Sequence, residues 1–299
     1  MPLCLHRLKV QAIAKLCVGI LILVALEKRV GGEPSSKTRF AYVFYVTDRS
    51  YLCYAAINVH RLLNVTETKT RPDVDIVLLV IKGLSIDSVC LASCHPEVDP
   101  NRIKIKYLDR APKITQNHYY AQSYLRFSAY SLYEYERIII LDADGVILKN
   151  LDHLFELDLE GKGFAASLAY YEEVPWLSSV TQVVVPNPRL YARVTEALTP
   201  SGIKKVAAFN KPGNIYDMDV LNYLFQIDKR TKLLPMHYAT LDSHFHEGKH
   251  AEDLPKTFFV HFSMKKPHIF GTTRNWKDAT VPFNVAFIKY WEGRVRVCK

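Results

Sequence analysis

Two acidic residues, Asp142 and Asp144, directly follow the apolar run Ile138–Leu141. Such a run is typical of a buried strand, and carboxylates at its end lose hydration unless a cation or another partner stabilises them. In open α/β sheets, ligands bind beyond the carboxyl ends of the strands. The position of this pair therefore predicts a functional site that takes a charged ligand.

The same Asp-x-Asp pattern occurs twice more, so the pattern alone carries little information. Asp73 and Asp75 lie at the N-terminal end of an expected strand, which is the wrong end for a ligand, and we expect them in a solvated loop. Asp217 and Asp219 open an expected helix, where acidic residues cap the N-terminus and interact favourably with the helix dipole.

Two enzyme chemistries use a pair of aspartates at a strand end. In a phosphohydrolase of the haloacid-dehalogenase type, the first aspartate attacks phosphorus, and Leu141–Leu148 resembles the first motif of that family with Asp142 as the nucleophile. That motif normally lies on the first strand of the core, whereas here it follows three expected strands. In a nucleotide-sugar glycosyltransferase, the pair holds a divalent metal against the diphosphate of the leaving nucleotide.

Short β-rich runs alternate with helical patterns along the chain. The expected strands are 40–46, 75–81, 103–108, 137–141, 163–169, 181–185 and 257–262, and the expected helices are 51–63, 85–94, 119–133, 188–197, 218–227 and 282–291. The strand–helix alternation of the first half predicts a mostly parallel central sheet with helices on both faces. We predict a single α/β domain over residues 40–299.

Further motifs occur in three stretches, Tyr124–Phe155, Tyr216–Asn222 and Val260–Ser263. Together, and in this order along the chain, they resemble glycosyltransferase family 8, and most closely its glycogenin-like and fungal N-acetylglucosaminyltransferase-like members. The resemblance implies a GT-A fold and a manganese cofactor. It also implies an enzyme that moves a hexosyl or N-acetylhexosaminyl group from a UDP-sugar to a glycan or glycoconjugate acceptor, with retention of the anomeric configuration.

The resemblance also assigns roles to individual residues. It makes Asp142, Asp144 and His261 the metal ligands, a set that suits manganese. It assigns binding of the nucleotide sugar to Thr47, Tyr51, Arg126, Ala143, Asp217 and Lys266, with Tyr51 suited to stacking on uracil and Asp217 as the sugar-pocket carboxylate and catalytic candidate. His261 lies only five residues before Lys266, a shorter spacer than the family typically has. A catalytically inactive nucleotide-sugar-binding relic is therefore a further alternative.

Other potential metal ligands are less well supported by their spacing. Three histidines, His244, His246 and His250, occur in one polar stretch. Histidines in a polar loop without a fixed scaffold are usually solvated, so the sequence does not favour a metal there. Cys90 and Cys94 lack the second half of a zinc signature, and we expect buried thiols or a disulfide.

The N-terminal segment carries a targeting pattern. Basic residues precede the apolar run Leu16–Leu26, which suits a signal peptide or signal-anchor over residues 1–32, and a short linker over 33–39 follows. We therefore expect a single-pass type II membrane protein of the Golgi or ER with a luminal domain, or a secreted protein if the segment is cleaved. Asn64, in an expected loop, would then be a glycan acceptor.

The composition excludes several other classes of protein. The 299 residues include 39 Lys and Arg against 30 Asp and Glu, a formal net charge of +9. The basic residues are scattered, which favours a phosphate-bearing small substrate over nucleic acid. A hydrophobic share of 49%, with a single apolar run long enough to enter a membrane, excludes a disordered chain and a multi-span membrane protein.

Overall fold

The computed structural model describes residues 39–84, 100–110, 122–210, 215–226, 230–263 and 266. All of these residues belong to one compact unit, Thr38–Lys299. The expected helices 85–94 and 282–291, and the targeting segment 1–32, lie outside the described residues. Within the described ranges, no helix combines the length and the apolar character needed to cross a membrane.

The described residues contain the following elements. The strands are β1 (Phe40–Val46), β2 (Val74–Ile81), β3 (Ile103–Leu108), β4 (Arg137–Leu141), β5 (Gly145–Ile147), β6 (Phe164–Leu168), β7 (Leu177–Val184), β8 (Lys232–Leu234), β9 (Thr240–Leu241) and β10 (Phe259–His261). The α-helices are α2 (Arg49–Asn64), α4 (Pro188–Ala197), α5 (Pro200–Phe209) and α6 (Asp217–Phe225). Short 3₁₀ helices cover Pro100–Arg102, Ser123–Ser131, Asp152–Glu156, Met236–Tyr238, Asp242–Gly248 and Ala251–Lys256.

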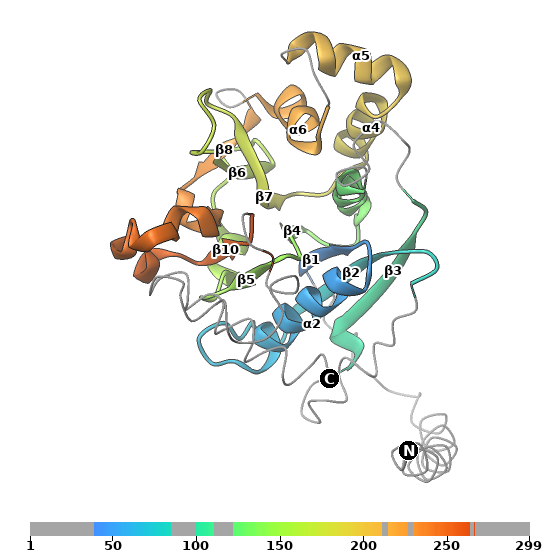
Figure 1. The fold of residues 1–299 in the computed structure, drawn as a ribbon. Coiled ribbons are helices and arrows are strands. Elements are labelled where there is room, and N and C mark those ends of the chain that lie inside the picture. The colour runs from blue at the N-terminus through green and yellow to red at the C-terminus, as the bar shows by residue number, and fades with distance from the viewer. Residues whose placement is uncertain are drawn as a thin grey trace, which may run out of the picture. The chain divides into compact units, whose positions relative to one another are not determined.

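A seven-stranded sheet forms the centre of this unit, in the order β3-β2-β1-β4-β7-β6-β8 (Figure 1). The strands β3, β2, β1 and β4 run parallel, whereas β7 is antiparallel to both of its neighbours. In the middle of the parallel half, Tyr42 of β1 lies opposite Ile76 of β2 and Ile139 of β4. Every residue of β1 is buried, as expected for a strand covered on both faces. The prediction of a mostly parallel α/β sheet is confirmed.

Hydrophobic cores lie on both faces of this sheet, because successive residues of a strand point to opposite sides. From β1, Tyr42 and Phe44 enter one core, and Val43 and Tyr45 enter the other. The first core is shared with α2 and with a small three-stranded sheet in the order β5-β10-β9. The second is covered by the 3₁₀ helix Ser123–Ser131 and by α4 and α6 (Figure 1).

The small sheet returns a late part of the chain to the end of β4. β10 pairs antiparallel with β5, and His261 lies opposite Gly145. A Cβ atom at Gly145 would lie 2.2 Å from Cζ of Phe259 and 2.6 Å from the carbonyl oxygen of Val260. These distances are far inside van der Waals contact, so the close approach of β10 requires glycine at this position.

Most of the predicted elements occur with the expected type. The bounds agree at 40–46, 103–108, 137–141 and 188–197, whereas the strand expected at 181–185 begins at Leu177 and the one expected at 257–262 is limited to Phe259–His261. The helix expected over 119–133 is a 3₁₀ helix within the described part, Ser123–Ser131. The sequence does not predict the short strands β5, β8 and β9 or the helix α5.

The prediction of a solvated loop is wrong for Asp75. This residue is the second of β2, is 6% exposed, and accepts a hydrogen bond of 2.9 Å from the Tyr135 hydroxyl. Asp73 does stay at the surface, in an ion pair with Arg71. The hydroxyl partner of Asp75 is 60 residues away in sequence, so no local pattern indicates its burial.

Candidate functional site

Three candidate metal ligands meet where the ends of β4 and β10 approach each other. Asp142 directly follows β4, Asp144 lies in the next turn, and His261 is the last residue of β10. The Nε2 atom of His261 lies 3.2 Å from Oδ1 of Asp144 and 3.6 Å from Oδ2 of Asp142. One ligand atom from each residue lies within 4.8 Å of the others. Two carboxylates and one imidazole at these separations fit a divalent transition metal.

The turn that carries the two aspartates is held by Asn58 of α2. The amide nitrogen of Asn58 donates to the carbonyl oxygens of Gly145 at 2.9 Å and of Ala143 at 3.4 Å. Its amide oxygen accepts the main-chain N–H of Ile147 at 3.0 Å. Ala143, which the resemblance assigns to the nucleotide sugar, has a fully buried side chain in this turn.

Arg126 supplies a buried counter-charge to Asp142. Its guanidinium nitrogen Nη2 lies 2.6 Å from Oδ1 of Asp142 and donates to the Tyr45 hydroxyl, also at 2.6 Å. The Tyr45 hydroxyl in turn donates to the same carboxylate oxygen at 3.1 Å. Burial raises the pKa of Asp142, and Arg126 and His261 oppose that rise. The guanidinium therefore compensates part of the cost of burying this carboxylate.

Asp144 has two cationic neighbours of its own. The ammonium group of Lys266 contacts Oδ2 of Asp144, while His261 lies next to Oδ1. Burial acts to raise the pKa of Asp144, but His261 and Lys266 outweigh it and hold that pKa well below the usual range of an aspartate. Lys266 therefore reaches the site in spite of the short spacer that separates it from His261.

Asp217, the first residue of α6, faces the same group of residues. Its Oδ1 atom accepts a hydrogen bond of 3.0 Å from the Ser123 hydroxyl, and its Oδ2 atom lies 3.0 Å from Nε of Arg126. The Nε–H of Arg126 points to the carbonyl oxygen of Ser123 instead. Oδ2 of Asp217 is therefore buried next to a positive charge and accepts no hydrogen bond from the described residues.

Asp219 has a different role from Asp217, although the two residues share one Asp-x-Asp pattern. Its Oδ2 atom accepts the main-chain N–H of Tyr216 at 2.7 Å, which closes a capping box at the start of α6. The helix-capping explanation therefore describes the carboxylate of Asp219, whereas that of Asp217 faces Arg126.

One cavity of about 590 Å³ connects these groups. Among its lining residues are Thr47, Tyr51, Arg126, Asp142, Asp144, Asp217, His261 and Lys266. Of the predicted site residues, Ala143 alone is not in this lining. The lining also includes Tyr45, Ser123 and Tyr171, which the sequence does not single out. The place of Tyr45 near the carboxyl end of β1 is a signal that could have found it, because ligands bind at that end.

Comparisons with known proteins agree with this geometry. The family model described as glycosyl transferase family 8 matches residues 42–189. Glucose N-acetyltransferase 1 of Saccharomyces cerevisiae is 31% identical over 175 residues, which cover 56% of this chain and 35% of the yeast protein. UDP-glucuronate:xylan alpha-glucuronosyltransferase 2 of Arabidopsis thaliana is 23% identical over 242 residues, which cover 80% of this chain and 37% of the plant protein. This chain thus spans little more than a third of the length of either relative.

A solved structure shows the same fold. The crystal structure of the galactosyltransferase LgtC in complex with donor and acceptor sugar analogues superposes with a TM-score of 0.58 and 16% identity, covering 87% of this chain and 96% of LgtC. At this level of identity the likeness shows the fold alone. The fold is the GT-A glycosyltransferase fold, as predicted.

Proposed function

Since this chain belongs to glycosyltransferase family 8, we propose that it transfers a hexosyl or N-acetylhexosaminyl group from a UDP-sugar to a glycan or glycoconjugate acceptor, with retention of configuration. The observation that carries this proposal is the position of Arg126, which contacts both Asp142 of the candidate metal site and Asp217. The metal-binding and sugar-binding carboxylates thus share one cavity, whose volume of about 590 Å³ is in the range of small-molecule sites.

We propose manganese as the metal, with Asp142, Asp144 and His261 as its protein ligands. When bound, the ion would neutralise charge that develops on the leaving diphosphate. Lys266 lies against Asp144, and Arg126 lies against Asp142. Both cations therefore stand where they can attract the diphosphate of a nucleotide sugar.

Asp217 is the residue that we propose to act on the sugar. Its Oδ2 atom is a buried acceptor that receives no hydrogen bond from the described residues, so it can accept one from a donor hydroxyl. Its negative charge would also stabilise the positive charge that develops at the anomeric carbon. In the same-face attack that we propose, the acceptor oxygen bonds to the anomeric carbon as the bond to phosphate breaks, and the acceptor proton passes to the departing phosphate oxygen.

The geometry does not favour the alternatives. A phosphohydrolase needs a carboxylate oxygen that is free to attack, but Oδ1 of Asp142 is occupied by Arg126 and Tyr45, and Oδ2 lies 3.6 Å from His261. An inactive relic would be expected to have lost contacts at the altered motif after His261. Lys266 of that motif instead contacts Asp144.

The decisive experiment is a screen of UDP-sugars for manganese-dependent hydrolysis and transfer. The panel includes UDP-glucose, UDP-galactose and UDP-N-acetylglucosamine. It also includes UDP-glucuronate, because the name of one relative contains this donor. We expect turnover of at least one donor, with a product whose anomeric configuration is retained by NMR. A product of inverted configuration, or an Asp142-dependent hydrolysis of phosphomonoesters without sugar transfer, would contradict the proposal.

We propose a luminal location in the Golgi for this domain, with the N-terminal segment as a type II anchor. Cys53 on α2 forms a disulfide, and disulfides persist in oxidising compartments. Asn64 is partly exposed and ends α2 rather than lying in the predicted loop. In secretory-competent cells we expect a glycosidase-sensitive mass shift that Asn64→Gln abolishes, together with Golgi co-localisation. An unglycosylated protein in the cytosolic fraction would refute this location.

A further inference from the structure

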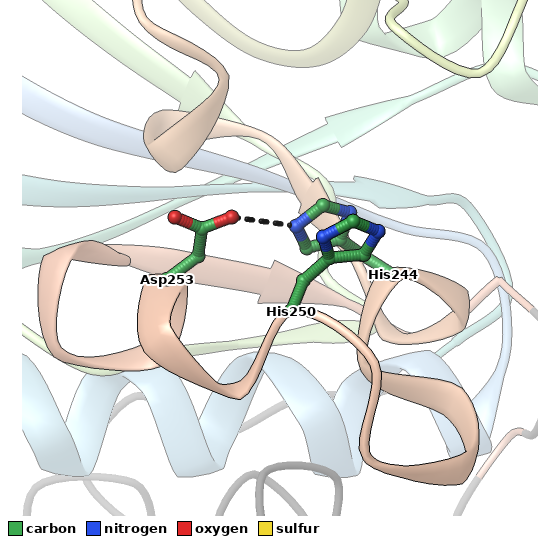
Figure 2. A group of neighbouring side chains, drawn as sticks. All are labelled: His244, His250 and Asp253. Carbon is green, nitrogen blue, oxygen red and sulfur yellow. Dashed lines mark hydrogen bonds and ion pairs between the residues drawn. The ribbon is translucent and has the colours of Figure 1, made fainter.

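A second group of potential metal ligands lies outside the cavity of the candidate active site. Figure 2 shows His244, His250 and Asp253 with their side chains pointing toward one another. His244 lies in the 3₁₀ helix Asp242–Gly248, His250 precedes the 3₁₀ helix Ala251–Lys256, and Asp253 lies within it. One ligand atom from each residue lies within 4.8 Å of the other two.

The packing around His244 gives this group the fixed scaffold that the sequence does not reveal. The side chain of His244 is 10% exposed, and its ring packs edge-on against Tyr170 at 5.3 Å between centroids. The hydroxyl of Tyr170 in turn accepts the main-chain N–H of Leu241 at 2.9 Å. Tyr170, which follows β6, thus contacts both the ring of His244 and the main chain just before the 3₁₀ helix that carries His244.

The other two ligands contact His244 in different ways. The ring of His250 stacks on that of His244 with 4.2 Å between centroids and 9° between planes. Asp253 places Oδ2 at 3.0 Å from Nε2 of His244, while its Oδ1 lies 3.4 Å from Nζ of Lys256. His250 adopts a left-handed backbone conformation with φ of 52°, which is uncommon for a residue with a side chain. The backbone at His250 thus holds a rarely populated conformation where the two rings stack.

We propose that His244, His250 and Asp253 form a second divalent-cation site, which takes zinc. Two neutral imidazoles and one carboxylate are a ligand set that zinc accepts with a fourth position open. Ligand atoms about 2.1 Å from a tetrahedral zinc ion lie roughly 3.4 Å apart, whereas those of this group lie within 4.8 Å of one another, so the ring of His250 has to move out of the stack toward the other two ligands. The side chain of His250 is 54% exposed and can turn toward the ion.

The location indicates a structural role for this cation. The segment 242–256 connects β9 to β10, and β10 ends at His261. Asp242, at the start of the segment, accepts hydrogen bonds of 2.7 Å from both the main-chain N–H and the hydroxyl of Ser263. A zinc ion that joins His244 to Asp253 would therefore brace the segment whose ends support β10.

Zinc binding can be tested without measuring any transfer activity. The full chain is prepared in an Asp144→Asn/His261→Ala background, which removes two ligands of the first candidate site. The protein is stripped with a chelator, equilibrated with zinc sulfate, and desalted, and the bound zinc is measured by mass spectrometry. Further variants in this background are His250→Ala and, as a matched loss of one surface imidazole, His153→Ala.

We expect about one zinc ion per chain in the background protein and in its His153→Ala variant, and at least a tenfold loss of affinity with His250→Ala. Because the side chain of His250 is exposed, we expect the His250→Ala protein to fold normally, and circular dichroism checks its fold. Cobalt provides a second readout, because a nitrogen–oxygen site of low coordination gives a visible absorption band that His250→Ala should remove. Absence of bound zinc in the background protein, or unchanged binding after His250→Ala, would overturn the proposal whether or not the enzyme is a glycosyltransferase.

Discussion

The main-chain N–H of Phe262 donates a hydrogen bond of 3.0 Å to the carbonyl oxygen of Asp144. The chain directly after β10 is thus fastened to the second aspartate of the turn after β4. Together with the pairing of His261 opposite Gly145, this bond fixes the imidazole beside the two carboxylates. The candidate metal site therefore depends on the contact between β5 and β10.

Replacement of Gly145 tests that dependence. In Gly145→Ala, the new Cβ atom would overlap the Phe259 ring and the Val260 carbonyl. We expect a loss of about 1–3 kcal/mol in the free energy of unfolding and weaker manganese binding, measured by urea denaturation and by calorimetric titration. The control is Gly161→Ala, where open space surrounds the new atom but φ is +70°. It should cost roughly 1 kcal/mol and leave manganese binding unchanged. Equal manganese affinity in both variants would contradict the dependence.

The metal triad separates the glycosyltransferase from the other candidates. We expect Asp144→Asn and His261→Ala each to lower manganese-dependent turnover by about two orders of magnitude or more, because each removes a ligand of the ion. UDP binding, followed by titration calorimetry with and without manganese, should lose its metal dependence in the same variants. A phosphohydrolase predicts instead that Asp142→Asn abolishes activity while a folded His261→Ala protein keeps it. A binding relic predicts nucleotide affinity that manganese does not change even in the wild type.

The neighbouring carboxylates of α6 form a matched pair for the sugar-binding role. Asp217→Asn removes the charge that faces Arg126, and we expect about a 10²- to 10³-fold fall in kcat. Asp219→Asn keeps an oxygen that can accept the Tyr216 N–H, so kcat should change by less than about threefold and the helix cap should persist. Steady-state rates with the best donor of the panel, together with thermal unfolding, make the comparison. Equal rates in the two variants would remove Asp217 from the mechanism.

The charge of Arg126 is predicted to support folding as well as binding. Arg126→Met would leave the carboxylates of Asp142 and Asp217 buried without their counter-charge, and we expect a loss of about 3–5 kcal/mol in the free energy of unfolding. The control is Arg39→Met, which breaks the exposed ion pair with Glu136 and should have a much smaller effect. Urea denaturation at neutral pH compares the two. Similar losses of unfolding free energy in the two variants would show that burial does not determine how much the ion pairs of Arg126 contribute to stability.

Much of the central sheet could be predicted from the sequence, because its strands are continuous apolar runs. The bounds of β1 and β4 follow from such runs, and the end of β4 locates Asp142 and Asp144. The strands β5, β8 and β9 have only two or three residues, which is too short for any periodicity to show. The assignment of His261 rests on the family resemblance, since nothing local to residue 261 indicates that its strand pairs with Gly145.

Contacts between distant residues set the limit of prediction inside the site. The hydrogen bond from Ser123 to Asp217 joins residues 94 apart in sequence, and that from Tyr45 to Asp142 joins residues 97 apart. In the sequence, each of these residues is accounted for by its own helix or buried strand, so nothing nearby indicates its distant partner. The fixed packing of His244 against Tyr170 is likewise invisible in the sequence, which is why the histidine-rich stretch suggests solvation.

The hydrogen bonds of Asn58 have a consequence for how tightly the candidate metal site can hold an ion. Because Asn58 holds main-chain atoms of Gly145 and Ile147, the turn has its shape before a cation arrives. Ordering a flexible residue costs roughly 1–2 kcal/mol, and this preorganised turn avoids most of that entropy loss. The amide proton of Ile147 should then resist exchange with deuterium equally well in the apo and metal-loaded protein.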